Sequence, residues 1–269
     1  MRIFGAQFVS LSEGSDNFEG IYGLIGSAFN DTLTGTGLAS VLYGGAGDDF
    51  FKDASAIFGG DGIDTVNFGD LSYKVFIRMA GINANVFDVE LMLGTSFSDK
   101  IYGDDLSNTV NGNGGDDELR GLLGDDLLYG NVGNDQLFGD GGNDQLFGSL
   151  GNDSLTGGYG DDILLGSTGA DTLNGDGGND HLSGGKGNDS LIGGSGADTF
   201  VYARGDGHDA IRTFQNGSDV INITSGATSF ADVTVSQQGA DTLVEFSNVT
   251  ILLYGIDFLS ITAADFTFG

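Results

Sequence analysis

Aspartate recurs every nine residues through the middle of this chain, and ten aspartates from Asp117 to Asp198 share one phase. Glycine stands five residues and again two residues before each of them, and an apolar residue stands two residues after. Glycine adopts positive φ without a Cβ clash and lets backbones approach closely, so each aspartate follows a tight turn beside exposed carbonyls. Carboxylates next to carbonyl oxygens are hard ligands that suit Ca²⁺, which takes about six to eight of them.

The same phase extends beyond this run in both directions. Two nonapeptides at 94–111 keep the frame, and a shorter block lies at 26–67. After residue 201 the phase slips, which leaves two echoes of the pattern. Ser40 and Asn108 stand where aspartate is expected, so their loops should bind metal weakly or not at all. The predicted metal ligands are Asp31, Asp49, Asp64, Asp99, Asp117, Asp126, Asp135, Asp144, Asp153, Asp162, Asp171, Asp180, Asp189, Asp198, Asp209 and Asp219.

The elements that position these aspartates must be short strands. When the glycine at the start of each nonapeptide is position one, aspartate is position six and the apolar residue, Leu or once Phe, is position eight. Positions seven to nine predict a very short strand with one side chain turned inward. One such residue in nine cannot form a core alone, but stacked on identical neighbours it forms a continuous column.

This pattern resembles the RTX calcium-binding repeat, GGxGxDxUx, where U is a large apolar residue. The resemblance covers twelve contiguous nonapeptides and four upstream ones, more than half of the chain. It implies an all-β fold, a right-handed parallel β-roll in which two nonapeptides form each turn. It also implies roughly ten Ca²⁺ ions between the turns on both edges, each held by position-six carboxylates of neighbouring turns and by loop carbonyls. Aspartates eighteen residues apart would then share an edge.

The composition limits the possible partners. The chain has 39 acidic and 9 basic residues, a net charge of −30, which should repel nucleic acid and anionic lipid. Roughly a dozen divalent ions would offset most of that charge. The chain contains no Cys, Pro or Trp, so no disulfide can stabilise the fold. No apolar run reaches the ~18 residues that span a bilayer, so no transmembrane segment is expected.

The two ends of the chain suggest a route of export. The first residues, MRIFGAQFVSLSEG, do not look like a signal peptide. The last, LLYGIDFLSITAADFTFG, resemble the C-terminal region of proteins exported by bacterial type I secretion. The resemblance implies a chain that stays unfolded at low cytosolic calcium and folds outside the cell, where calcium is roughly millimolar.

The pattern divides the chain into four parts. Residues 1–67 form an N-terminal segment with the short repeat block. Residues 68–93, the spacer, are either an insertion that packs against the roll or a segment that joins two rolls, with an alternating strand at 74–79. Residues 94–201 form the main roll. Residues 202–269 are predicted to form a β cap with strands at 232–235, 242–246 and 249–254, because a solenoid end needs covering.

Together these features predict a secreted, non-enzymatic calcium-binding protein with a structural or adhesive role at the cell surface or in extracellular matrix. Its expected partners are calcium, type I secretion machinery, and either further copies of itself or a cell-surface polysaccharide. One alternative is the calcium-binding and export module of a secreted enzyme, such as a protease, lipase or alginate epimerase. Another is a small membrane-active protein, although the long apolar or amphipathic stretches of such toxins are absent.

Other motifs have simpler explanations. Acidic pairs such as Asp116-Asp117 could serve a glycosidase, but the repeat accounts for them. His181 and His208 have no Cys or further His nearby in the sequence that could complete a zinc site, so they are predicted to be surface residues. The tripeptide Arg204-Gly205-Asp206 matches a short adhesion motif and overlaps an echo of the repeat.

Overall fold

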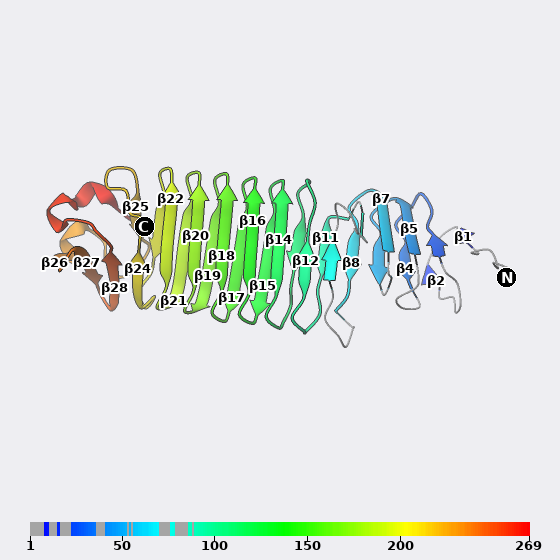
Figure 1. The fold of residues 1–269 in the computed structure, drawn as a ribbon, viewed down its shortest axis with the longest axis horizontal. Coiled ribbons are helices and arrows are strands. Elements are labelled where there is room, and N and C mark those ends of the chain that lie inside the picture. The colour runs from blue at the N-terminus through cyan, green and yellow to red at the C-terminus, as the bar shows by residue number, and fades with distance from the viewer. Residues whose placement is uncertain are drawn as a thin grey trace.

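Residues 8–10, 15–16, 23–35, 41–52, 54, 56–69, 76–78, 86–87 and 89–269 are described in the computed structural model. They wind into an elongated parallel β-solenoid of about ten turns. Its strands stand side by side along the long axis, and the chain ends in a cap at the end opposite the N-terminus (Figure 1). The predicted all-β class and parallel roll are confirmed.

Three sheets form the two walls of the solenoid. One wall is a thirteen-stranded sheet in the order β2 (Ser15–Asp16), β4 (Thr32–Thr34), β6 (Phe50–Lys52), β8 (Thr65–Asn67), β11 (Leu91–Leu93), β13 (Thr109–Asn111), β15 (Leu127–Val132), β17 (Gln145–Leu150), β19 (Ile163–Gly169), β21 (His181–Gly187), β23 (Thr199–Tyr202), β25 (Val220–Ile223) and β29 (Phe266–Phe268).

The second wall consists of two shorter sheets. The first is five-stranded, in the order β1 (Phe8–Ser10), β3 (Gly23–Ile25), β5 (Val41–Ala46), β7 (Ala56–Asp61) and β10 (Val86–Phe87). The second is eleven-stranded, in the order β9 (Phe76–Arg78), β12 (Lys100–Tyr102), β14 (Glu118–Leu123), β16 (Gln136–Gly141), β18 (Ser154–Tyr159), β20 (Thr172–Gly177), β22 (Ser190–Ser195), β24 (His208–Ile211), β28 (Val249–Leu253), β27 (Asp241–Phe246) and β26 (Thr234–Gln238).

The core is the column of inward side chains that the period predicts. In the main roll each strand pairs in parallel with the strand two further on, which places Leu119 beside Leu137 on one wall and Leu128 beside Leu146 on the other. Every position-eight residue there is fully buried. These residues are Ile101, Val110, Leu119, Leu128, Leu137, Leu146, Leu155, Leu164, Leu173, Leu182, Leu191 and Phe200.

The spacer at 68–93 is built into the wall. β11 pairs with β8 on one side and β13 on the other, so the thirteen-stranded sheet continues through it. On the second wall β10 joins the upstream sheet and β9 begins the main one. Of the strand predicted at 74–79, β9 covers the centre, and the rest lies outside the described residues.

The C-terminal end departs from the repeat. β24 pairs in parallel with β28, and β28, β27 and β26 then pair antiparallel. Three short 3₁₀ helices complete it, η1 (Phe230–Asp232), η2 (Phe258–Ser260) and η3 (Ala263–Asp265). The strand predicted from 232 begins at Thr234 because Asp232 Oδ2 accepts the N–H groups of Thr228 and Ser229, at 3.0 and 3.1 Å, and holds a helical turn. No helix among the described residues is long and apolar enough to cross a membrane.

Candidate metal centres

Carboxylates link successive turns along both edges of the roll. The N–H of Asp135 donates to Oδ1 of Asp153, and the N–H of Asp153 donates to Oδ1 of Asp171, each at 2.8 Å. We call such a column a carboxylate ladder. One ladder contains Asp99, Asp117, Asp135, Asp153, Asp171, Asp189 and Asp209, and the other contains Asp31, Asp49, Asp64, Glu90, Asp126, Asp144, Asp162, Asp180, Asp198 and Asp219.

The structure places all sixteen predicted ligands in these ladders, and each of them is buried. The second ladder is broken at Asn108. The Oδ1 atom of Asn108 accepts the N–H of Asp104 in its own loop at 2.9 Å, although its own N–H still donates to Asp126 Oδ1 at 2.7 Å. Ser40, the other position without a carboxylate, lies outside the described residues.

Most ladder carboxylates keep one buried oxygen without a protein partner. This holds for fourteen of the sixteen predicted ligands, and the exceptions are Asp99 and Asp219. Thr95 donates its N–H to Asp99 Oδ2 at 2.6 Å, and Gln215 donates its N–H to Asp219 Oδ2 at 2.7 Å. A buried carboxylate oxygen with no donor is energetically costly, so the repeated orphan oxygens indicate that a bound cation is their partner.

In the main roll, the glycine at position one opens the space that the orphan oxygen faces. A Cβ built on Gly139 would clash with Asp144 Oδ2 and would lie 2.6 Å from the carbonyl oxygen of Gly157 in the next turn. The same pair of neighbours surrounds Gly166, where the carbonyl is that of Gly184. Each space therefore offers a carboxylate and a carbonyl oxygen, the hard donor types that Ca²⁺ prefers. The residues present fit the predicted ion.

Burial raises the pKa of the ladder aspartates. Desolvation is the main cause and lifts the pKa of Asp117 and Asp126 to about 8 and that of Asp153 to about 6. Neighbouring carboxylates raise these pKa values further, while the backbone N–H bond from the adjacent turn lowers them. A bound divalent cation would supply the positive charge that holds these carboxylates ionised.

Two further positions explain which departures from the repeat are tolerated. At position four, Gly151 has φ +138°, and a Cβ there would overlap the carbonyl oxygen of Gly133 in the turn below. At position two the backbone is left-handed, with φ near +70 to +90° at non-glycine residues such as Asn131 and Ser149. Asn and Asp enter that region readily, so in the ten nonapeptides from 112 to 201 position two varies while position four does not.

The sequence interpretation missed a second set of bonds at position five. The N–H of Asn143 donates to Asp125 Oδ1 at 2.7 Å, and the N–H of Asn152 donates to Asn134 Oδ1 at 2.9 Å. These exposed side chains run parallel to the ladders and also link one turn to the next. The frequent Asp or Asn just before the ladder aspartate was the available signal.

Glu90 was also missed. Its Oε2 accepts the N–H of Asp64 at 2.7 Å, so the spacer supplies a carboxylate where no nonapeptide exists. The signal was an acidic residue two positions before the buried Met92, the same offset that separates ladder aspartate from leucine.

The alternative motifs find other uses. In the pairs Asp48-Asp49, Asp116-Asp117, Asp125-Asp126 and Asp161-Asp162 the second residue belongs to a ladder and the first to the position-five row. Asp206 is buried and accepts the N–H of Ala203 at 2.5 Å, so it is not presented as an adhesion motif requires. Within the described ranges, no three His, Cys, Asp or Glu side chains lie close enough together to form a metal cluster.

The chain belongs to the family of RTX calcium-binding nonapeptide repeats. The family model matches residues 25–52, 93–128, 102–137, 120–155, 138–173 and 174–209, which together cover more than half of the chain. No curated protein sequence matches it.

Among solved structures, the extracellular lipase LipA from Serratia marcescens is 19% identical, with a TM-score of 0.35, over 77% of this chain and 45% of the lipase chain. The AlgE6R2 subunit of the Azotobacter vinelandii mannuronan C5-epimerase is 29% identical, with a TM-score of 0.33, over 42% of this chain and 91% of that one. The AlgE6R3 subunit is 28% identical, with a TM-score of 0.27, over 46% and 77%. The matched region is thus less than half of the lipase.

Proposed function

We propose that this chain is a secreted scaffold that calcium folds after export, with a structural or adhesive role at the cell surface or in extracellular matrix. The supporting observation is the pair of carboxylate ladders, which run through the repeats with one orphan oxygen on nearly every aspartate. A net charge of −30 opposes compaction until cations bind. Type I secretion machinery is the proposed export route, because an ion-free chain of this charge would remain open enough to thread a channel.

We also propose that the chain has no catalytic activity of its own. The described acidic pairs are engaged in backbone bonds between turns, as at Asp116 and Asp117. The two histidines lie apart, with His181 exposed on β21 and His208 Nδ1 2.5 Å from Thr250 Oγ1. Among the residues that the structure describes, neither contacts a nucleophile and a carboxylate in the arrangement that acyl transfer needs.

A cell-fractionation experiment tests the structural role. The tagged chain is supplied to producing cells in millimolar calcium and, in parallel, in chelator. We expect it to stay with the cell surface or matrix only in calcium, because the binding surface exists only in the folded roll. A chain that folds in calcium yet remains free in the medium would contradict the structural role and leave the calcium-dependent fold intact.

A further inference from the structure

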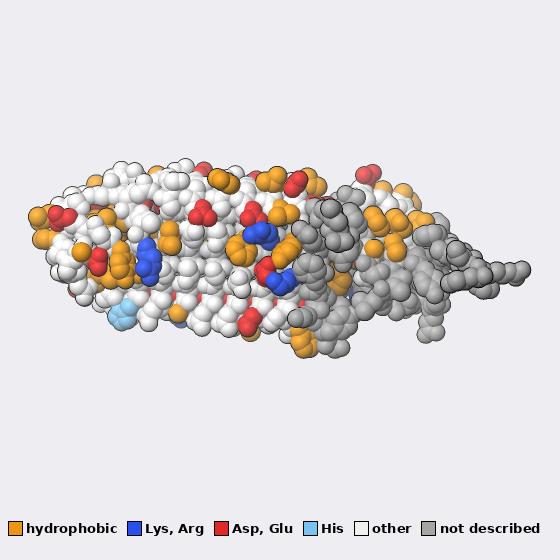
Figure 2. Space-filling model, in the orientation of Figure 1, with side chains coloured by type: hydrophobic (Ala, Val, Ile, Leu, Met, Phe, Trp, Pro, Cys, Tyr) orange, Lys and Arg blue, Asp and Glu red, His pale blue; other side chains and the backbone are white. Residues whose placement is uncertain are grey.

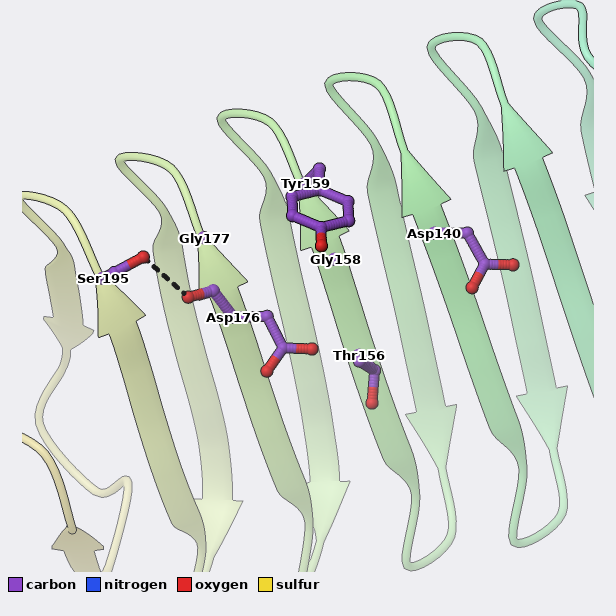
Figure 3. Close-up of a pocket in the computed structure, with 7 residues that line it drawn as sticks. All are labelled: Asp140, Thr156, Gly158, Tyr159, Asp176, Gly177 and Ser195. Atoms are coloured by element: carbon purple, nitrogen blue, oxygen red, sulfur yellow. Dashed lines mark hydrogen bonds between the residues drawn. The ribbon is translucent and has the colours of Figure 1, made fainter.

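A shallow pocket lies on the outer face of the eleven-stranded sheet, separate from the ladders. Its volume is about 390 Å³, and the residues that line it include Asp140, Thr156, Gly158, Tyr159, Asp176 and Ser195. They come from β16, β18, β20 and β22, four neighbouring strands whose side chains project to the same side (Figure 3). The carboxylates of Asp140 and Asp176 take no part in the predicted calcium sites.

The pocket arises from an alternation at positions two and three of the repeat. Strand pairing places Tyr159 between Gly141 and Gly177, and places Gly158 between Asp140 and Asp176. Tyr159 therefore has no side chain beside it on either neighbouring strand and is 82% exposed. An aromatic residue that stands in the open between two carboxylates has no role in the packing of the roll.

The two carboxylates differ in their charge balance. Arg120 Nε lies 3.1 Å from Asp140 Oδ2 and balances the charge of that carboxylate. Figure 2 shows lysine and arginine side chains beside acidic ones on this face. Asp176 accepts a neutral hydrogen bond from Asn174 Nδ2 at 2.7 Å, and no lysine or arginine within the described residues forms an ion pair with it. The pocket thus has one uncompensated negative charge next to the Tyr159 ring.

We propose that this pocket binds an organic ammonium ion, with the cationic group between the Tyr159 ring and the Asp176 carboxylate. The face of an aromatic ring attracts an ammonium group, and quaternary ammonium ligands use such rings. A single carboxylate is a poor site for Ca²⁺, which needs about six to eight oxygen ligands. The carboxylates also repel anions. The volume leaves room for a small substituent on the nitrogen, such as the hydroxyethyl group of choline.

Nuclear magnetic resonance titration of the calcium-loaded protein tests this proposal. Choline is the probe, and its neutral analogue, in which carbon replaces the nitrogen, controls for shape. The variants are Tyr159→Leu, which keeps an apolar side chain, and Asp176→Asn, which suits the left-handed backbone there at φ 68°. Asp105→Asn is the matched control, because Asp105 is an exposed acid of the main roll outside the pocket. Circular dichroism in calcium verifies that each variant is folded.

We expect saturable shifts centred on residues 158–159 and 176–177 with choline and none with the neutral analogue. Tyr159→Leu and Asp176→Asn should each weaken binding by about three- to thirtyfold, while Asp105→Asn should leave it unchanged. The proposal is overturned if choline gives no saturable shifts, if the analogue binds equally well, or if Asp105→Asn weakens binding as much as Asp176→Asn. A second arm uses phosphatidylcholine vesicles to distinguish the two sources of the ligand. If the pocket binds a lipid headgroup, the wild-type chain should sediment with the vesicles, and if it binds a free cation, the chain should stay in solution.

Discussion

Each ladder aspartate uses its two carboxylate oxygens differently. In Asp153 one oxygen accepts the N–H of Asp135, and the other faces the space beside Gly148 without a partner. The first oxygen fixes the distance between turns, and the second is available to a cation. Substitutions at single residues can separate these two contributions.

Asp117 and Asp116 offer a matched pair for such a test. Asp117→Asn keeps an oxygen for the N–H of Asp99 but removes the buried charge. We expect it to remove about one ion and to lower the free energy of unfolding of the calcium-loaded protein by about 2 kcal/mol. Calcium-titrated chemical denaturation and calorimetry measure both. Asp116→Asn, an exposed neighbour, should change neither, and equal effects of the two would contradict the assignment of Asp117 as a ligand.

Glycine at position one can be tested in the same way. Gly148→Ala places a methyl group against Asp153 Oδ2, in the space assigned to the ion, and should destabilise the calcium-loaded roll by more than about 2 kcal/mol. Gly141→Ala is the control, because a Cβ there would meet nothing closer than Leu123 Cδ2 at 3.3 Å, and that side chain can move. Thermal unfolding in calcium distinguishes the two, and a fully stable Gly148→Ala would be inconsistent with the site geometry.

At this scale the sequence predicts much of the site. The period identifies the ladder aspartates from Asp99 to Asp198, because a residue repeated in phase must recur in the same place on each turn. Asp209 and Asp219 lie out of phase and are found only from echoes of the motif. Glu90 is missed because it lies in the spacer, outside the nine-residue period. It joins the ladder only because the spacer stacks against the turn that contains Asp64. The position-five bonds are missed because exposed Asp and Asn are ordinary in any loop.

Strands of the roll are too short to be stable alone, and the ladders connect them along the edges. β14 and β16 pack their leucines in the core of the roll, and a carboxylate bond between Asp117 and Asp135 links the two turns at the edge. Because the ladder carboxylates lie one above another, their charges repel, and this repulsion adds to the desolvation that raises their pKa values. The stability of the metal-free roll must therefore depend on pH.

We predict that acid favours the metal-free fold. The folded-state pKa values of Asp117, Asp126 and Asp162 are raised to about 8, 8 and 7, above the ordinary value of 3.8. Protonation therefore stabilises the fold fully below about pH 4, and this contribution is lost as the pH rises through 6 to 8. Circular dichroism of calcium-stripped protein should show β signal growing from pH 8 down to pH 5. A metal-free fold that is equally stable across this range would contradict the prediction.

The sequence is less informative about the elements outside the repeat. Two strands of the cap are predicted because they alternate and are rich in β-branched residues, whereas the start of β26 depends on the cap that Asp232 provides. The path of the spacer could not be predicted, because pairing with both β7 and β12 is a tertiary property of β10 and β9. No local pattern encodes such long-range partners.

Over the whole molecule, an excess of thirty negative charges is arranged on a solenoid, and each strand of its main roll from β12 to β22 buries one large apolar residue. In a repeat architecture each turn is stabilised by its neighbours, so ions between turns act along the full length. Folding and ion binding should then be one cooperative process, since the sites do not exist in the open chain.

Magnesium provides a test of ion specificity at this scale. Mg²⁺ requires near-ideal octahedral geometry at short distances and gives up its water reluctantly. We expect millimolar Mg²⁺ to leave the chelated chain largely unfolded by circular dichroism, although it carries the same charge as Ca²⁺. Equal recovery of β signal in Mg²⁺ would show that charge screening, and not coordination by the ladders, folds the protein.

The most direct test is a calcium titration of the chelated chain at pH 7, followed in parallel by far-ultraviolet circular dichroism and calorimetry. We predict a disordered chain that gains β signal in one cooperative transition as roughly ten ions bind. A chain already folded in chelator that takes up few ions would contradict it, because the orphan oxygens of the ladders would then be satisfied by something other than calcium.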